Sequence, residues 1–355
     1  MSFKNSVTYI FIVLLLSIGN QDVSAKKKLS GRLSLSGAFA LYPLAVAWAE
    51  EFKKENPDVQ IDISAGGAGK GITDVLNNMV EIGMVSREIN SSEIAKGAFK
   101  IGVAKDAVVP TISSNNPFLK EILAVGITQE TAKAIWIDGT FKTYQEAFKT
   151  SNKNTPLRIY TRSDACGAAE VWAKYLDSSK KQEDLLGNGV FGDPGLAVAI
   201  KNDKLGIGFN NIGYVFDFKT KKPVDGITII PLDLNNDGKI DKDESFYESI
   251  DKLTDAIKSN KFPSPPSREL YFVTKNKPTD PLLVAFLEWV LSDGQRIVKA
   301  SGFVPIDKKE LQLTLDTFVA KQVQKETKEP KEPKESKVNK EPKESKKKGV
   351  NNVQK

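Results

Sequence analysis

Three short segments rich in small residues stand between a strand-like run and a helix-like run. They are Ser36-Gly-Ala-Phe-Ala-Leu-Tyr-Pro43, Ser64-Ala-Gly-Gly-Ala-Gly-Lys-Gly71 and Arg162-Ser-Asp-Ala-Cys-Gly-Ala-Ala-Glu170. Each predicts a helix N-terminus, where free backbone N–H groups and the helix dipole stabilise an anion. Arg162 adds a guanidinium, and Asp164 is placed to orient it. Any one segment alone would be an ordinary Gly-rich turn, but the three together predict a pocket for a tetrahedral oxyanion.

The composition argues against most enzymatic chemistry. The chain has no His, which removes Ser–His–Asp and Cys–His catalysis and most transition-metal sites. Cys166 is the only cysteine, and Trp172 stands six residues later, where a phosphatase-type thiolate loop needs an arginine. We therefore expect a binding protein. An enzyme acting on the same pocket, such as a phosphohydrolase, is the alternative from a different class.

A second motif has different chemistry. In the twelve residues from Asp233 to Glu244, oxygen-bearing residues stand at the ligand positions of a calcium loop and a glycine stands at its sharp turn. The predicted ligands are Asp233, Asn235, Asp237, the carbonyl of Lys239, Asp241 and Glu244. A strand is expected before the loop and a helix after it, so the sequence predicts a single loop–helix unit with structural calcium. An Asp/Asn-rich turn without a metal is the alternative.

The body of the chain alternates short apolar runs with amphipathic runs, which is typical of an α/β fold. Strands are expected at 31–36, 59–64, 82–86, 107–113, 157–161, 207–209, 227–231 and 270–275. Helices are expected at 44–55, 72–78, 129–135, 144–148, 168–176, 194–202, 244–260 and 281–292. A body of roughly 300 residues is large enough for two domains.

The two ends differ in composition from the body. Residues 1–25 combine a lysine, an apolar run and the small-residue end Val23-Ser-Ala25, which predicts a secretory signal peptide. Residues 321–355 contain 12 Lys and 6 Glu, so this tail carries the whole net charge of +6. The body is therefore neutral, which argues against a nucleic-acid binder. The tail is predicted to be disordered, either as a spacer or as a contact with an anionic envelope surface.

Leu29 to about Ile306 resembles the phosphate-binding receptor protein of bacterial and archaeal ABC importers. Besides the three loops, the resemblance rests on segments 82–89, 105–110, 206–211, 264–272, 286–295 and 302–305. It implies an α/β, type II periplasmic-binding-protein fold with two lobes, the first from 29–108 and 273–318 and the second from 109–272. Two hinge strands, 106–113 and 270–275, would join them.

The resemblance also implies the function and the site. The chain would be a monomer, secreted to the periplasm or associated with the envelope, that captures inorganic phosphate and delivers it to the permease of an ABC importer. The matching site residues are Ala38, Phe39, Ala68, Ser86, Arg87, Arg162, Asp164, Cys166, Gly167 and Ala168.

This chain departs from the family pattern at the hydroxyl-bearing positions. Ala38, Phe39, Ala68, Cys166 and Ala168 replace them, so backbone amides are expected to hold the anion with the arginine. A family carboxylate that accepts the proton of hydrogen phosphate aligns near residue 86, where no acid stands. Asp106 or Asp164 could take its place. Sulfate or arsenate therefore stays open as the ligand, and a calcium-stabilised surface or adhesion protein is a third class.

Overall fold

The computed structural model describes residues 28–318, so the predicted signal peptide and charged tail lie outside the described residues. The strands are β1 (Gly31–Gly37), β2 (Val59–Ala65), β3 (Ile82–Val85), β4 (Ala98–Ser113), β5 (Arg158–Arg162), β6 (Asn188–Val190), β7 (Gly206–Asn211), β8 (Ile227–Ile229) and β9 (Ser267–Lys275). The helices are α1 (Tyr42–Glu55), α2 (Ala68–Leu76), α3 (Ser91–Ala95), α4 (Leu119–Val125), α5 (Gln129–Trp136), α6 (Tyr144–Phe148), α7 (Gly167–Leu176), α8 (Gly192–Asn202), α9 (Ile250–Lys258), α10 (Pro281–Leu291) and α11 (Lys308–Phe318). None of these helices is both long and apolar enough to cross a membrane.

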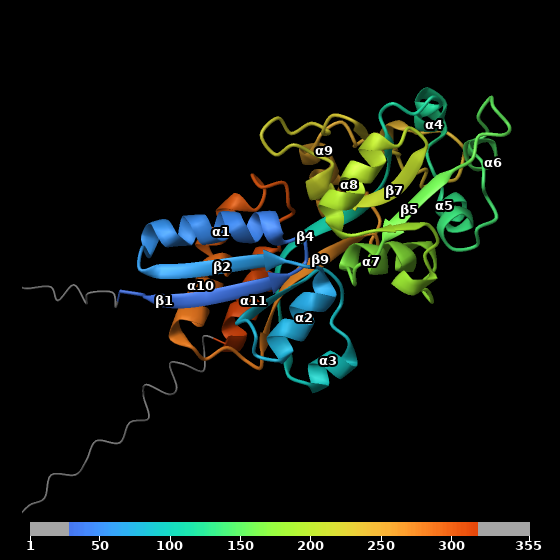
Figure 1. The fold of residues 1–355 in the computed structure, drawn as a ribbon. Coiled ribbons are helices and arrows are strands. Elements are labelled where there is room, and N and C mark those ends of the chain that lie inside the picture. The colour runs from blue at the N-terminus through green and yellow to red at the C-terminus, as the bar shows by residue number, and fades with distance from the viewer. Residues whose placement is uncertain (1–27, 319–355) are drawn as a thin grey trace, which may run out of the picture.

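A single sheet runs through the whole described chain. Its strand order is β2-β1-β3-β9-β4-β7-β5-β6, and β8 pairs with β4. The 16-residue strand β4 is the link, because its first part pairs antiparallel with β9 over Ala98–Ala107 and its last part with β7 over Val108–Ile112. Figure 1 shows β4 and β9 side by side between two groups of helices and strands. The predicted α/β fold is confirmed.

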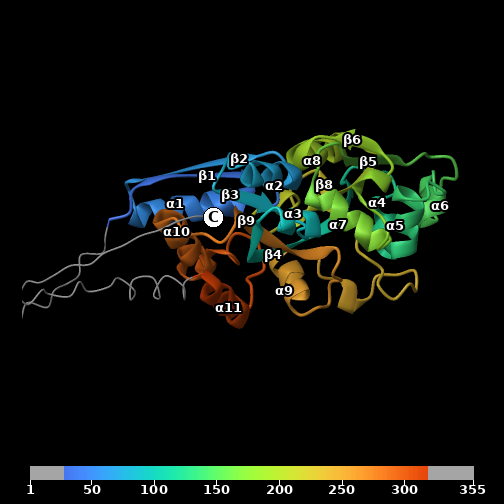
Figure 2. The same ribbon diagram turned by 90° about the horizontal axis from the view of Figure 1, so that it is seen from below.

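Two separate hydrophobic cores define the two lobes. The first core takes Val103 and Ala104 from β4, and the second takes Ala107 and Val108 from the same strand. The lobe boundary on β4 therefore lies between 104 and 107, a few residues before the predicted position. Figures 1 and 2 both place α1 and α10 in the first lobe and α5, α7 and α8 in the second.

The second hinge strand, β9, also passes from the second lobe to the first at an earlier residue than the sequence suggested. The stretch of β9 from Leu270 to Val273 is buried in the first core, and Arg268 pairs in register with Asp106 of β4. The two strands thus cross the lobe boundary together at this arginine–aspartate pair. The sequence pattern could not reveal this crossing. Both strands are buried on both faces there, so apolar and polar residues do not alternate along them.

The helix expected over 244–260 is shorter in the structure. Glu244 ends a single 3₁₀ turn instead, and α9 begins after Ser249, whose hydroxyl accepts the Lys252 amide at 3.3 Å. The Glu244 carboxylate accepts backbone amides of the preceding loop, so this residue belongs to that loop and not to the helix.

Candidate functional site

The three predicted loops meet where the lobes touch. The Gly69 amide in the first lobe donates to the Ala165 carbonyl in the second at 3.0 Å. Gly167, at the start of α7, lies against the end of β3 so closely that a Cβ atom there would be 2.2 Å from the Ser86 carbonyl oxygen. The lobes are therefore in direct contact around the predicted anion pocket.

Several backbone amides in these loops have no hydrogen-bond acceptor within residues 28–318. They are the amides of Phe39, Ala68, Gly167 and Ala168. The last three belong to the first turns of α2 and α7, where helical geometry leaves N–H groups unpaired. The predicted Ala38 amide differs, because it donates to the Met84 carbonyl at 2.8 Å and is taken up by the sheet.

Arg162, at the end of β5, is held by two carboxylates. Its Nε and Nη2 donate to Asp164 at 2.8 and 2.7 Å, and its Nη1 donates to Asp193 at 2.7 Å. All three side chains are nearly fully buried, with the guanidinium side chain 1% exposed. A guanidinium has five N–H donors, so two remain after these three bonds. The carboxylates fix the orientation of the guanidinium, as expected for Asp164 and not foreseen for Asp193.

This buried polar network continues to the hinge. Asn211 donates to Asp193 at 2.6 Å and accepts a bond from Arg268, whose Nε donates to Asp106 at 2.8 Å. Complete burial raises the pKa of Asp106, and Arg268 opposes that rise. One chain of hydrogen bonds therefore joins Arg162 in the second lobe to the pair at which β4 and β9 cross between the lobes.

Phe39 of the first lobe packs into the second. Its ring centroid lies 5.7 Å from the Arg162 guanidinium carbon and 6.0 Å from the Phe191 ring. Gly192 has a φ of +73°, and a Cβ there would lie 3.1 Å from the Phe39 ring. Tyr214 of the second lobe donates to the Phe39 carbonyl at 2.9 Å. The guanidinium therefore lies over the Phe39 ring, within the range of a cation–π interaction.

Cys166 serves the start of α7. Its sulfur accepts the Ala169 amide at 3.3 Å, which makes it the N-cap of the helix. Burial raises the pKa of the Cys166 thiol to about 12, against an opposing effect from Arg162. A buried neutral thiol is a poor nucleophile. The structure therefore assigns this residue a capping role.

The sequence matches one protein family over residues 22–294, and that family is described as PBP superfamily domain. The chain belongs to the PBP superfamily. Similar members include "Phosphate-binding protein PstS" of Bacillus subtilis, which is 30% identical over 232 residues, 61% of this chain and 72% of that protein. "Protein SphX" of Synechococcus elongatus is 25% identical over 298 residues, 81% of each chain.

Solved structures share the fold of this PBP-superfamily member. A putative phosphate ABC transporter substrate-binding protein with bound phosphate, from Clostridium perfringens, has a TM-score of 0.63 at 21% identity and covers 78% of this chain and 100% of that chain. An ABC-type phosphate transport receptor from Vibrio cholerae has a TM-score of 0.56 at 15% identity over 77% and 100% of the two chains. At such identities the likeness establishes the fold, and with the family match it confirms the predicted resemblance.

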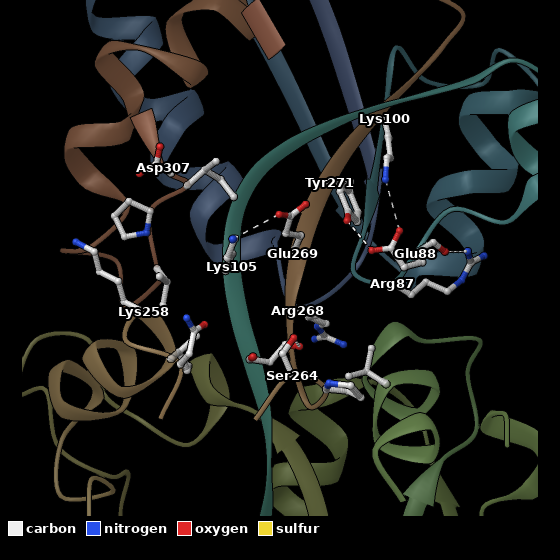
Figure 3. A pocket seen from close by; sticks show the side chains of 18 of the residues that line it. Arg87, Glu88, Lys100, Lys105, Lys258, Ser264, Arg268, Glu269, Tyr271 and Asp307 are labelled. Atoms are coloured by element: carbon white, nitrogen blue, oxygen red, sulfur yellow. Dashed lines mark hydrogen bonds and ion pairs between the residues drawn. The ribbon is translucent and has the colours of Figure 1, made fainter. Parts of the chain in front are cut away.

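Arg87 is placed differently from the other predicted site residues of this PBP-superfamily protein. Its Nη1 and Nη2 donate to both oxygens of Glu93 at 3.0 and 2.8 Å. It lines a separate cavity of about 820 Å³ beside the hinge strands, which Figure 3 shows from close by. In that cavity Lys105 pairs with Glu269 at 3.5 Å. Arg87 is thus neutralised locally, whereas Ser86 stays beside the unpaired amides.

In the predicted calcium loop, side chains of the predicted ligands bond to groups of the loop itself. The Glu244 carboxylate accepts the Leu234 amide at 2.7 Å and the Asp241 amide at 3.0 Å. The Lys239 ammonium lies 3.1 Å from a carboxylate oxygen of Asp237 and also of Asp241. Within the described part of the chain, no group of three or more His, Cys, Asp or Glu residues is arranged to hold a metal ion. Calcium binding here stays a prediction.

Three residues of the network were missed in the sequence. Asp193 follows Gly192 at the start of α8, Asn211 is the last residue of the segment 206–211, and Arg268 lies within the segment 264–272; both segments carry the family resemblance. A sequence signal existed for the last two, because they are polar residues at the boundaries of apolar strands. Nothing in the local sequence indicates that Asp193 meets Arg162, 31 residues away.

Proposed function

We propose that this chain captures inorganic phosphate between its lobes, outside the cytoplasm, and delivers it to the permease of an ABC importer. The observation that carries the proposal is the set of amides without an acceptor among residues 28–318, which come from both lobes where these meet and lie on the loops that also carry Arg162 with its two remaining N–H groups. Relatives described as phosphate-binding proteins, and a similar fold solved with bound phosphate, support the choice of ligand.

The anion would be held mainly by backbone. The amides of Phe39 and Ala68 face it from the first lobe, and those of Gly167 and Ala168 from the second, so both lobes contribute donors. Hydrogen bonds to a charged partner contribute about 1.5–3 kcal/mol each. Because donors from both lobes share one ligand, phosphate would stabilise the closed arrangement over an open one.

Asp164 is the better candidate to accept the ligand proton. Within residues 28–318 its Oδ2 receives one bond, from Arg162, and a Cβ on Gly67 of the first lobe would lie 3.0 Å from it. This oxygen therefore borders the amides and keeps a free lone pair. Both oxygens of Asp106, by contrast, are bound by Arg268.

This position of Asp164 implies that the site distinguishes between oxyanions that carry a proton and those that do not. Hydrogen phosphate can donate its proton to the carboxylate, whereas sulfate has no proton at neutral pH and would meet an uncompensated negative charge. Phosphate is therefore the expected ligand over sulfate. Arsenate has the same shape and a proton, so it is expected to compete with phosphate.

Uptake of labelled phosphate by the parent cell tests the proposal. Removal of the gene should lower high-affinity uptake, the wild-type gene should restore it, and a gene carrying Arg162→Lys should not. Uptake that is unchanged by removal of the gene, under phosphate limitation, would contradict the transport function. Hydrolysis of a generic phosphoester by the purified protein would instead favour a phosphohydrolase.

A further inference from the structure

We propose that the loop from Asp233 to Glu244 in the second lobe binds one calcium ion. The first observation is the state of Asp233, which is 2% exposed. Its Oδ2 accepts the Gly238 amide at 2.9 Å, so the carboxylate points into the loop. Its Oδ1 is buried and has no hydrogen-bond partner within residues 28–318. A buried carboxylate oxygen without a donor is costly, and a cation bound in the loop would satisfy it.

The other oxygen-bearing residues stand at the sequence positions of a calcium loop, and because their carboxylates are not gathered at one point in residues 28–318, the ion would have to draw them together. Counting Asp233 as the first, positions three, five, nine and twelve are Asn235, Asp237, Asp241 and Glu244. The glycine at position six has a φ of +80°, which the sharp turn of such loops requires. The ligand set is entirely oxygen and carries four carboxylates, which suits a hard divalent cation.

Two of these carboxylates already share a cation. The Lys239 ammonium lies 3.1 Å from Asp237 Oδ2 and 3.1 Å from Asp241 Oδ1. The lysine side chain is 64% exposed, so it can leave for water at little cost. Calcium binding would replace this single charge with a double charge at the same carboxylates.

Glu244 must also change its partners. Its carboxylate is buried and accepts the amides of Leu234, Asn235 and Asp241. As the twelfth residue it would turn at least one oxygen from these amides toward the ion. Because that exchange offsets part of the binding energy, the affinity should fall in the range of extracellular calcium modules, about 10⁻⁴–10⁻³ M.

The loop is tied to a different part of the second lobe. The Asp233 amide donates to the Ile127 carbonyl at 3.1 Å, and the Ile240 amide donates to the Ala124 carbonyl at 3.3 Å. Both acceptors belong to the end of α4 and the connection that follows it. Calcium would therefore fasten this connection to the segment that leads into α9 and stabilise the second lobe, apart from any role in phosphate binding.

The test is a calorimetric titration of the chelator-treated, full-length secreted protein with calcium, followed by thermal melting. We expect one ion per chain and a rise in Tm of about 3–10 °C at ~10 mM calcium. Asp233→Asn should weaken calcium binding by about tenfold or more, because it removes a charged ligand. Asp243→Asn removes the same charge at position eleven, where the side chain is 91% exposed and pairs with Lys261, and should leave the affinity unchanged.

If Asp233→Asn fails to fold, the exposed ligand variant Asp237→Asn gives the same test. A cooperative thermal melt of each variant without calcium reports whether it is folded, and phosphate titration of the same variants separates the calcium site from the anion site. The proposal is overturned if the wild-type protein takes up no calcium and its Tm does not change on chelation. It is equally overturned if Asp243→Asn weakens calcium binding as much as Asp237→Asn does.

Discussion

Replacing Arg162 with lysine is the sharpest test of how the anion is held. Three of the five guanidinium N–H groups are bound to buried carboxylates, and two remain for the ligand. An ammonium has three donors at one point, and they would stay with the carboxylates. Two lost charge-assisted bonds, at about 1.5–3 kcal/mol each, amount to ~3–6 kcal/mol. The dissociation constant for phosphate should therefore rise by about 10²- to 10⁴-fold.

The assay is a calorimetric phosphate titration of Arg162→Lys beside Arg158→Lys. Arg158 lies on the same strand, is 58% exposed and pairs with Asp203, so its replacement should leave affinity unchanged. The Arg162 variant should also melt lower, because a single ammonium cannot match the planar geometry with which the guanidinium meets two buried carboxylates, and poorly made bonds to buried carboxylates cost about 1–3 kcal/mol. A variant that is folded at the assay temperature and binds phosphate with wild-type affinity would refute a direct role of the guanidinium.

Three further outcomes are expected. Gly167→Ala should lower phosphate affinity by about 5- to 100-fold, because its new Cβ would lie 2.2 Å from the Ser86 carbonyl oxygen and hold the lobes apart. The matched change Gly213→Ala makes only an ordinary 3.4 Å contact and should have no effect in the same titration. Asp164→Asn should reduce the preference for phosphate over sulfate in competition binding, and equal preference to the wild type would exclude this carboxylate as the proton acceptor. Because burial raises the pKa of Cys166 to about 12, the thiol should resist alkylation at pH 8 in the folded protein and react after unfolding; fast labelling of the native protein would show that the thiol is accessible.

Local sequence patterns were enough to predict the α/β fold and part of the candidate anion site. Small-residue turns before apolar helical runs predicted α7 to within one residue of its start, because free amides at a helix N-terminus follow from backbone geometry alone. They predicted α2 as well, but its start at Ala68 lies four residues before the predicted one, within the small-residue turn itself. The pairing of Arg162 with Asp164 was also foreseen, since the two residues are neighbours along the chain. The first half of β4 was missed, because it contains charged side chains such as Lys100 and Lys105 at a lobe edge.

Contacts between residues far apart in the chain could not be predicted from the sequence. Asp193 lies on a different element of the same lobe, 31 residues after Arg162, and Arg268 lies where β9 crosses between the lobes; no local periodicity encodes either contact. The same limit explains the different placements of Ala38 and Arg87. The Ala38 amide donates a hydrogen bond to the Met84 carbonyl of the neighbouring strand β3. The Arg87 guanidinium donates to the carboxylate of Glu93 on α3.

The measurement that tests the central claim most directly is a titration of the purified, anion-stripped wild-type protein with phosphate and then with sulfate. Amides from both lobes and Arg162 should bind one phosphate per chain, and sulfate should give little or no heat because of the carboxylate at Asp164. Tight sulfate binding with silent phosphate would contradict the assigned ligand. No oxyanion binding at all would contradict the assignment of these loops as the site.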